Sequence, residues 1–249
     1  MKIGILGYEV PHRKVLEIAF SLKENGHEVT IFGFPFKARK NNEEPIFRDR
    51  PVPIMSFDLA EYLKESGIAY IRCDGWDEKC QYTFNEASKD CNYIITCIAK
   101  IIPKNMTTNN IILNTHPGVL PYNRGVDAFK RAIINNWPIG ITLHRIDEDI
   151  DAGTVIKTVN VPIFPGDNLE KVCDRAFNIE IRLLIESSQY ITDVNMSKKK
   201  ENSSGKSYKL YRNTINSEEE ERINDHFKEN IRNFIAHSKK KEKHEDEFK

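Results

Sequence analysis

The chain of 249 residues lacks three features that would each indicate a class of protein. It has no surplus of either charge, because 37 basic residues balance 37 acidic ones. Proteins that bind bulk nucleic acid usually carry a basic surplus, so we expect no nucleic-acid partner. No apolar run approaches the length of a membrane span, and the apolar start Lys2–Gly7 is too short for a signal peptide. We therefore expect a cytoplasmic protein without membrane association.

Cysteine is also scarce. The chain has five, and an odd number without C-x-x-C spacing is not typical of a disulfide framework or a zinc site. They are Cys73, Cys80, Cys91, Cys97 and Cys173. We interpret them as reduced thiols and expect no bound metal.

Strand-like and helical segments alternate along most of the chain. Lys2–Gly7 is a continuous apolar run, Arg13–Asn25 has an apolar face that stops at Gly26, and Glu28–Gly33 is again strand-like. Strand–helix–strand units with buried strands favour a parallel sheet with right-handed crossovers. The further predicted elements are a helix at Phe57–Ser66 and strands at Ala69–Cys73, Asn92–Ile98 and Ile111–Asn114. We predict an α/β fold, an open and mostly parallel sheet of Rossmann-like type with helices on both faces.

A long helix is expected to close this main domain at residues 1–194. Before it we predict a helix at Asp127–Asn135 and strands at Ile141–Leu143 and Thr154–Pro162. The long helix covers Asn168–Ile191, and its inner face carries Leu169, Val172, Cys173, Ala176, Ile179, Leu183 and Leu184.

The composition changes near Asn195, where a small C-terminal α/β extension (195–238) is expected to begin. It contains a short strand at Tyr208–Tyr211 and a helix that starts at the capping box Ser217–Glu220. That helix carries an apolar stripe of Ile223, Phe227, Ile231 and Phe234, which must dock on the main domain or on another subunit. The charged tail 239–249 is predicted to be disordered.

Two polar clusters stand where apolar runs end. Asn114 and His116 follow the strand at Ile111–Asn114, and ligands of open α/β sheets bind at the carboxyl ends of strands. Side chains at positions i and i+2 of a strand share a face, so the two can enter one pocket. Asn114 alone could cap a turn, and His116 alone could be a buried core histidine. Together with the carboxylate of Asp151 they can stabilise an oxyanion and move protons, and this combination predicts catalysis.

The spacing of these residues resembles that of a known family. N-x-H-P-x-x-L-P spans Asn114 to Pro121, and H-x-x-D-x-x-x-D-x-G spans His144 to Gly153. The pair of motifs is similar to that of the folate-dependent formyltransferases. The resemblance implies that Asn114, His116 and Asp151 are the catalytic residues and that N10-formyltetrahydrofolate is the formyl donor. We interpret His144 and Asp147 as residues that support this trio.

The same resemblance suggests where the folate is held. Thr96–Pro103 looks like the strand-end loop that lines the pteridine pocket in the family. By that likeness the cofactor-binding residues are Cys97, Ile98, Lys100, Ile102, Asp147, Glu148 and Asp149. Plain core packing is the alternative for Ile98–Ile102.

Features missing from the chain narrow the range of formyl acceptors that we expect. The turn after the first strand, Gly7–Arg13, lacks the Gly/Ser-rich phosphate loop of the glycinamide ribonucleotide enzymes. The roughly fifty residues after the main domain cannot build the second barrel of methionyl-tRNA formyltransferases, and no regulatory domain precedes the first strand as in the formyltetrahydrofolate hydrolases. What remains resembles the small nucleotide-sugar N-formyltransferases.

That branch implies an acceptor such as dTDP-4-amino-4,6-dideoxyglucose, used for bacterial surface polysaccharide such as lipopolysaccharide O-antigen. It also implies a homodimer, although the extension could equally lie on its own chain. Two alternatives stay open: a formyltransferase for another small amine such as glycinamide ribonucleotide, and a catalytically idle folate- or nucleotide-binding module.

A nucleoside diphosphate needs cations for its phosphates and an aromatic face for its base. The proline-rich and basic segment Phe34–Pro53 could supply both, with an ordinary solvated loop as the alternative. The residues predicted to bind the acceptor are Tyr8, Lys37, Arg48, Arg50, Trp76, Tyr122 and Arg124.

Overall fold

The computed structural model describes residues 1–36, 57–147, 149–191 and 208–240. Several predictions lie outside these ranges. They concern Lys37, Arg48, Arg50, Glu148, most of the segment Phe34–Pro53, and most of the charged tail.

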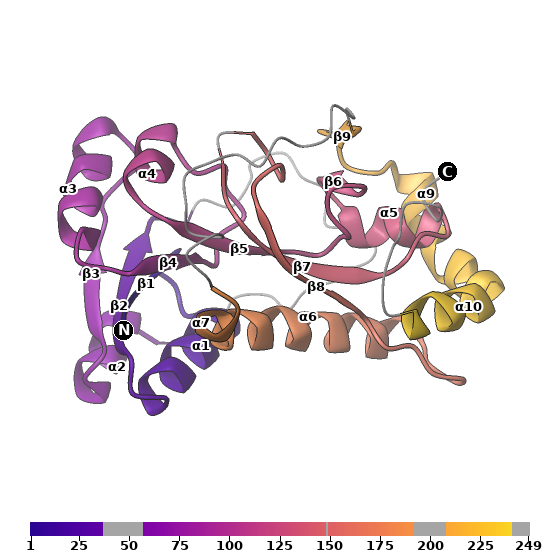
Figure 1. Ribbon diagram of the computed structural model, residues 1–249, viewed down its shortest axis with the longest axis horizontal. Helices are drawn as coiled ribbons and strands as arrows, with labels where there is room; N and C mark the ends of the chain where they lie inside the picture. The colour runs from indigo at the N-terminus through magenta and orange to yellow at the C-terminus, as the bar shows by residue number, and fades with distance from the viewer. Residues whose placement is uncertain (37–56, 148, 192–207, 241–249) are drawn as a thin grey trace. The chain divides into compact units, whose positions relative to one another are not determined.

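Within the described residues, seven strands form one sheet in the order β3-β2-β1-β4-β5-β7-β8. β1 pairs in parallel with β2 and β4, β2 with β3, and β4 with β5, whereas β7 and β8 are antiparallel. The strands are β1 Lys2–Tyr8, β2 Glu28–Phe34, β3 Ala69–Arg72, β4 Tyr93–Thr96, β5 Ile112–His116, β7 Gly140–Arg145 and β8 Val155–Asn160. The predicted α/β fold with an open, mostly parallel sheet is confirmed (Figure 1).

The chain divides into two compact units. The described residues of the first are 1–36, 57–114 and 184–189, and those of the second are 115–147, 149–183, 190–191 and 208–240. The first unit contains β1 to β4 and the start of β5. The second contains the end of β5, the β7–β8 pair and nearly all of the long helix.

The helices of the first unit begin at polar caps. The His12 ring accepts a hydrogen bond from Lys14 N–H before α1, and Asp58 and Asp77 cap α2 and α3 in the same way. The helices are α1 Arg13–Glu24, α2 Leu59–Ser66, α3 Glu78–Ser88 and α4 Lys104–Asn109. Sequence periodicity does not predict α3 and α4, because α3 buries only Phe84 and Ser88 and α4 only Met106.

The long helix of the second unit is α6, Leu169–Ile185. All seven residues predicted for its inner face are buried, at 6% exposure or less. It ends earlier than predicted, and Ser187–Tyr190 form a separate turn of helix, α7. The Ser187 hydroxyl donates to the Leu184 carbonyl at 2.7 Å, a local bond that competes with regular helix continuation.

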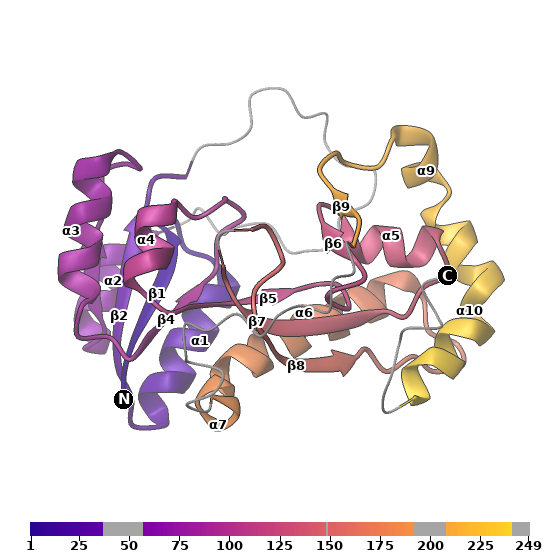
Figure 2. The same cartoon turned by 45° about the horizontal axis from the view of Figure 1, so that its top comes forward.

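The extension contributes a strand and two helices to the second unit. β9 (Leu210–Tyr211) pairs in parallel with β6 (Arg124–Gly125), as Figure 2 shows. α10 (Ile223–Lys239) packs against α5 (Ala128–Ile134) and β8. Its apolar stripe is therefore covered by its own chain, with Ile223, Phe227 and Phe234 buried and Ile231 half-buried.

The capping box of the extension is displaced by one residue from the prediction. Asn216 accepts from Glu219 N–H at 2.8 Å, and the Glu219 carboxylate accepts from Asn216 N–H at 3.1 Å. Asparagine caps helices as well as serine does, so Ser217 becomes the first residue of α9 (Ser217–Glu221). Among the helices described, none combines the length and hydropathy needed to cross a bilayer.

Candidate active site

Strand β5 carries two of the predicted catalytic residues. It runs through His116, so Asn114 and His116 are the third and the last residue of the strand rather than residues beyond its end. Being two apart, they lie on the same face of the strand. His116 is buried, at 5% exposure, and Asn114 is half-buried.

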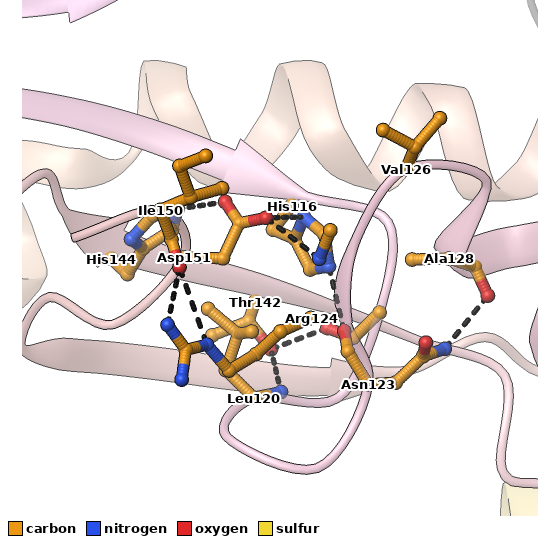
Figure 3. A network of polar contacts seen from close by, with 12 residues as sticks. His116, Leu120, Asn123, Arg124, Val126, Ala128, Thr142, His144, Ile150 and Asp151 are labelled. Atoms are coloured by element: carbon orange, nitrogen blue, oxygen red, sulfur yellow. Dashed lines mark hydrogen bonds and ion pairs between the residues drawn. The ribbon is translucent and has the colours of Figure 1, made fainter. Parts of the chain in front are cut away.

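The Asp151 carboxylate lies between two imidazole rings (Figure 3). Its Oδ2 is 3.5 Å from His116 Nδ1, and its Oδ1 is 4.0 Å from His144 Nε2. Gly125 N–H donates to the same Oδ2 at 2.9 Å. The structure thus brings His116 and Asp151 together, as predicted, and adds His144 to the same carboxylate.

Both ring nitrogens of His116 face oxygen atoms. Nε2–H donates to the Asn123 carbonyl at 2.8 Å, and Nδ1 faces Asp151. The arrangement fixes the orientation of the ring and places a negative charge beside it.

His144 lies in a different environment. Burial lowers the pKa of His144 to about 4, and the nearby His116 acts in the same direction, whereas the Asp151 carboxylate opposes the shift. Its Nδ1–H donates to the Arg145 carbonyl at 3.2 Å, which leaves Nε2 directed at Asp151. His144 is therefore neutral near neutral pH, and the supporting role predicted for it stays a prediction.

The turn that carries Asp151 depends on a close backbone approach. Asp151 itself has the left-handed conformation, with φ +48°, which aspartate tolerates better than most residues. The glycine of the D-x-G motif is required for a different reason. A Cβ on Gly153 would lie 1.7 Å from the Arg145 carbonyl oxygen, so only glycine fits against the end of β7.

Arg124 is tied to this turn. Its Nε and Nη2 both donate to the Ile150 carbonyl, at 3.2 and 2.6 Å. The guanidinium thereby holds the residue next to Asp151, and its predicted contact with the acceptor stays a prediction. Tyr122 is half-buried and meets the ring of Tyr208 edge-on, with centroids 5.3 Å apart.

Two further residues, which sequence patterns do not single out, shape the site. Asn123 is fully buried, and its side-chain NH2 donates to the Ala128 carbonyl at 2.7 Å while its own carbonyl receives His116. The Thr142 hydroxyl donates to the Gly118 carbonyl at 2.7 Å and accepts from Leu120 N–H at 3.2 Å. Thr142 stands between Ile141 and Leu143, and Asn123 lies between Tyr122 and Arg124, patterns that are too common to identify a site.

The predicted folate loop lies largely outside the core, with residues that range from half-buried to exposed. Cys97 and Ile98 are half-buried, Lys100 is exposed, and Ile101 is 71% exposed. Ile102 is the exception, because its side chain is buried. At the end of β4 the buried hydroxyl of Thr96 has no hydrogen-bond partner, so a polar ligand group could satisfy it.

Three of the predicted binding residues, Trp76, Lys100 and Tyr8, lie in the first unit and have aromatic or backbone contacts there. Trp76 stacks on Phe34 with centroids 4.0 Å apart, and the Lys100 ammonium lies 5.1 Å from the centroid of the Trp76 ring. The Tyr8 hydroxyl accepts from the backbone N–H of Ala99 at 3.2 Å, next to Lys100.

Asp147 and Asp149 lie in the second unit, on the turn after β7, half-buried and exposed respectively. No group of three or more metal-ligating side chains converges within the part of the chain that the structure describes.

Comparison with known proteins identifies the family. Residues 48–187, more than half of the chain, match the model described as formyl transferase. The chain belongs to the formyl transferase family. The match spans both motifs, from Asn114 to Gly153.

Among curated relatives, this formyl transferase is 40% identical over 62 residues to phosphoribosylglycinamide formyltransferase of Haemophilus influenzae, covering 24% of the chain and 29% of the relative. It is 36% identical over 81 residues to dTDP-4-amino-4,6-dideoxyglucose formyltransferase of Mycobacterium bovis, covering 32% and 35%. A methionyl-tRNA formyltransferase of Buchnera aphidicola is 30% identical over 112 residues, covering 44% and 36%. The chain spans about a third of the length of these relatives.

Solved structures agree on the fold. A sugar N-formyltransferase from a Shewanella species superposes with a TM-score of 0.52 at 20% identity, covering 88% of this chain and 86% of that one. A phosphoribosylglycinamide formyltransferase from Bacillus halodurans gives 0.55 at 19% identity, covering 79% and 100%. At such identities the likeness concerns the fold alone.

Proposed function

We propose that the protein transfers the formyl group of N10-formyltetrahydrofolate to the amino group of a nucleotide-linked amino-deoxysugar. One observation carries the proposal of catalysis: the Asp151 carboxylate is held 3.5 Å from His116, at the end of the strand that also carries Asn114. A binding module needs no such arrangement, because binding alone does not call for an amide, an imidazole and a carboxylate in this order.

Formyl transfer joins the acceptor amine to the formyl carbon and breaks the bond to the donor nitrogen. Negative charge develops on the formyl oxygen, one proton leaves the amine, and one reaches the leaving nitrogen. The Asn114 amide can donate a hydrogen bond to the oxygen, as oxyanion-stabilising groups do. The His116 ring, held between Asn123 and Asp151, can carry a proton from the amine to the leaving nitrogen. The Asp151 carboxylate stabilises the protonated ring of His116 and can accept the proton of the amine.

The donor supplies the activated formyl group, and residues of the folate loop in the first unit are suited to hold it. The exposed Lys100 and half-buried Ile98 offer a charge and an apolar surface, and the unpaired Thr96 hydroxyl offers a polar partner for a heterocycle.

Two features support a sugar nucleotide as the acceptor. Residues 7–13 lack a glycine-rich phosphate loop, and Trp76 stacks on Phe34 beside Lys100, which offers an aromatic face suited to a nucleobase. The relative from Mycobacterium bovis is named for such an acceptor. The second candidate acceptor is glycinamide ribonucleotide, favoured by the 40% identity to the Haemophilus influenzae enzyme. A cytoplasmic location and a homodimer stay predictions.

A mass-spectrometric assay tests the proposal. The protein is incubated with N10-formyltetrahydrofolate and a panel of nucleotide-linked amino sugars, with glycinamide ribonucleotide alongside and the Asp151→Asn variant as the blank. We expect a formylated sugar nucleotide with the wild-type protein and almost none with the variant. Formylation of glycinamide ribonucleotide alone would overturn the proposal that the acceptor is a sugar nucleotide. No product from any acceptor, despite measurable folate binding, would overturn the enzymatic function in favour of a binding module.

A further inference from the structure

We propose that the C-terminal extension positions the catalytic groups, by holding residues 122–127 (the catalytic loop) in the conformation that orients His116 and Asp151. The segment that does so is 208–220, here called the clamp segment. The inference rests on the proposed function, because it assigns a role in that reaction to residues that do not touch substrate. All the contacts involved lie within the second unit.

The catalytic loop supplies one backbone group to each catalytic side chain. The Asn123 carbonyl accepts from His116 Nε2–H at 2.8 Å, and Gly125 N–H donates to Asp151 Oδ2 at 2.9 Å. A shift of this loop would therefore change the orientation of both side chains. Displacements of about 1 Å in a catalytic constellation can cost roughly a hundredfold in rate.

The loop contains a strand too short to be stable by itself. β6 has two residues, and its partner in the described structure is β9 of the clamp segment. Val126 N–H donates to the Tyr211 carbonyl at 2.9 Å. Gly125 has φ +96°, and a Cβ there would lie 2.0 Å from that carbonyl oxygen, so the two backbones meet in direct contact.

Arg131 on α5 links the loop to the clamp segment. Its Nε donates to the Val126 carbonyl at 3.1 Å, and its Nη2 donates to the Asn213 carbonyl at 2.6 Å. The guanidinium also lies 4.3 Å from the centroid of the Tyr211 ring. The planar guanidinium of arginine can donate to two carbonyls and stack on an aromatic ring at the same time. The single ammonium group of lysine cannot reproduce this arrangement.

Further contacts reinforce the link. The Asp127 carboxylate accepts from Ile215 N–H at 3.1 Å. Lys130 forms an ion pair with Glu220, and both side chains are largely buried. Each contact joins a residue within or next to the catalytic loop to the clamp segment, and none involves a catalytic side chain. The extension thus helps to hold the catalytic loop that contacts His116 and Asp151.

The test compares two arginine variants. Arg131→Gln removes the bridge. Arg175→Gln is the matched control, because Arg175 also donates to a backbone carbonyl, at Pro162, and lies over a ring, that of Phe164, but contacts neither the loop nor the clamp segment. Hydrogen exchange of residues 122–127 is measured by mass spectrometry without substrates, and kcat and KM are measured in the formyl transfer assay.

For Arg131→Gln we expect faster exchange in residues 122–127 and a kcat lower by roughly ten- to a hundredfold, with the KM for the folate donor within about twofold. Arg175→Gln should keep both the exchange of the loop and kcat. Should Arg131→Gln fail to fold, Asp127→Asn weakens one contact at a position where asparagine tolerates the left-handed backbone, and we expect smaller changes in the same direction.

Unchanged exchange and kcat in the Arg131 variant would overturn the inference, as would equal losses in both arginine variants. Because hydrogen exchange needs no acceptor, it tests the clamp even if the proposed acceptor is wrong. If the wild-type protein transferred no formyl group, the proposed function would be contradicted. The exchange result would then decide whether the clamp segment holds the catalytic loop.

Discussion

At the scale of single residues, the carboxylate of Asp151 contacts two imidazole rings that have different partners. Both rings are buried and have an oxygen atom facing each nitrogen, but burial lowers the pKa of His144 to about 4. His144 therefore stays neutral near neutral pH. The proton-transfer role proposed for His116 and the supporting role of His144 stay predictions.

Loss of either group of the catalytic pair should abolish most of the turnover. His116→Asn removes the ring that carries the proton, and Asp151→Asn removes the charge that stabilises the protonated ring. We expect each to lower kcat on the order of a hundredfold or more. Initial rates of formyl transfer measure the effect, with His27→Asn, a histidine at the start of the chain and remote from the motifs, as the control. Near-normal rates in both variants would contradict the mechanism.

The lowered pKa of His144 predicts a dependence of stability on pH. The unfolded chain binds a proton at this residue below about pH 6.5 and the folded protein only near pH 4, so the unfolded state binds more protons between these values. Acidification through this window should destabilise the fold. Between pH 7.5 and 5 the expected loss attributable to His144 is about 2 kcal/mol.

Urea unfolding of the wild type and of His144→Asn at both pH values measures this contribution, because the difference between the two proteins removes the effect of other groups. The variant should be less stable at neutral pH and should lose less stability on acidification. Parallel loss in both proteins would show that His144 titrates normally.

At the scale of elements, a close approach between backbones determines the two turns of the site. Gly125 meets Tyr211 across the β6–β9 pair, and Gly153 meets Arg145 at the end of β7. In both places a Cβ would collide with another part of the backbone. For Gly125 this is a segment distant in sequence, and for Gly153 it is the other side of the turn. The D-x-G motif is thus explained by packing, since the left-handed residue in it is Asp151.

Gly153→Ala should therefore be more harmful than an ordinary glycine substitution. Its Cβ would meet the Arg145 carbonyl at 1.7 Å, which must displace the turn that carries Asp151. Gly166→Ala is the matched control, because Gly166 has φ +85° but open space around it, and should cost about 1–2 kcal/mol of stability. We expect Gly153→Ala to lower both the melting temperature and kcat, and Gly166→Ala only the melting temperature. Equal kcat values in the two variants would contradict this account.

Periodicity in the sequence predicts a helix only where the helix carries a continuous apolar face. α1 and α6 carry continuous apolar faces and were predicted, whereas α3 and α4 bury almost no apolar side chains and were missed. The capping box was misplaced by one residue because asparagine and serine stand side by side at positions 216 and 217. Local preference cannot decide between two good caps.

At the scale of the whole molecule, the balanced charge argues against a tRNA acceptor. With 37 basic and 37 acidic residues, the protein lacks the surplus that drives association with polyphosphates. We expect no retardation of methionyl-tRNA in a gel-shift assay at about 0.15 M salt. Binding that weakens steeply with added salt would contradict this and would reopen the methionyl-tRNA formyltransferases as a functional model.

The sequence by itself determined the class of fold and the family, and it predicted the catalytic residues. These follow from local information: apolar periodicity defines strands and helices, and two motifs spaced along the chain place Asn114, His116 and Asp151. The tertiary structure alone decided which groups complete the site. Asn123, Gly125 and Arg131 act through contacts with residues up to about ninety positions away, as between Gly125 and Tyr211, and no local pattern records a contact between distant segments. The position of the extension was decided in the same way, because an apolar stripe shows that a helix must dock but not on which surface.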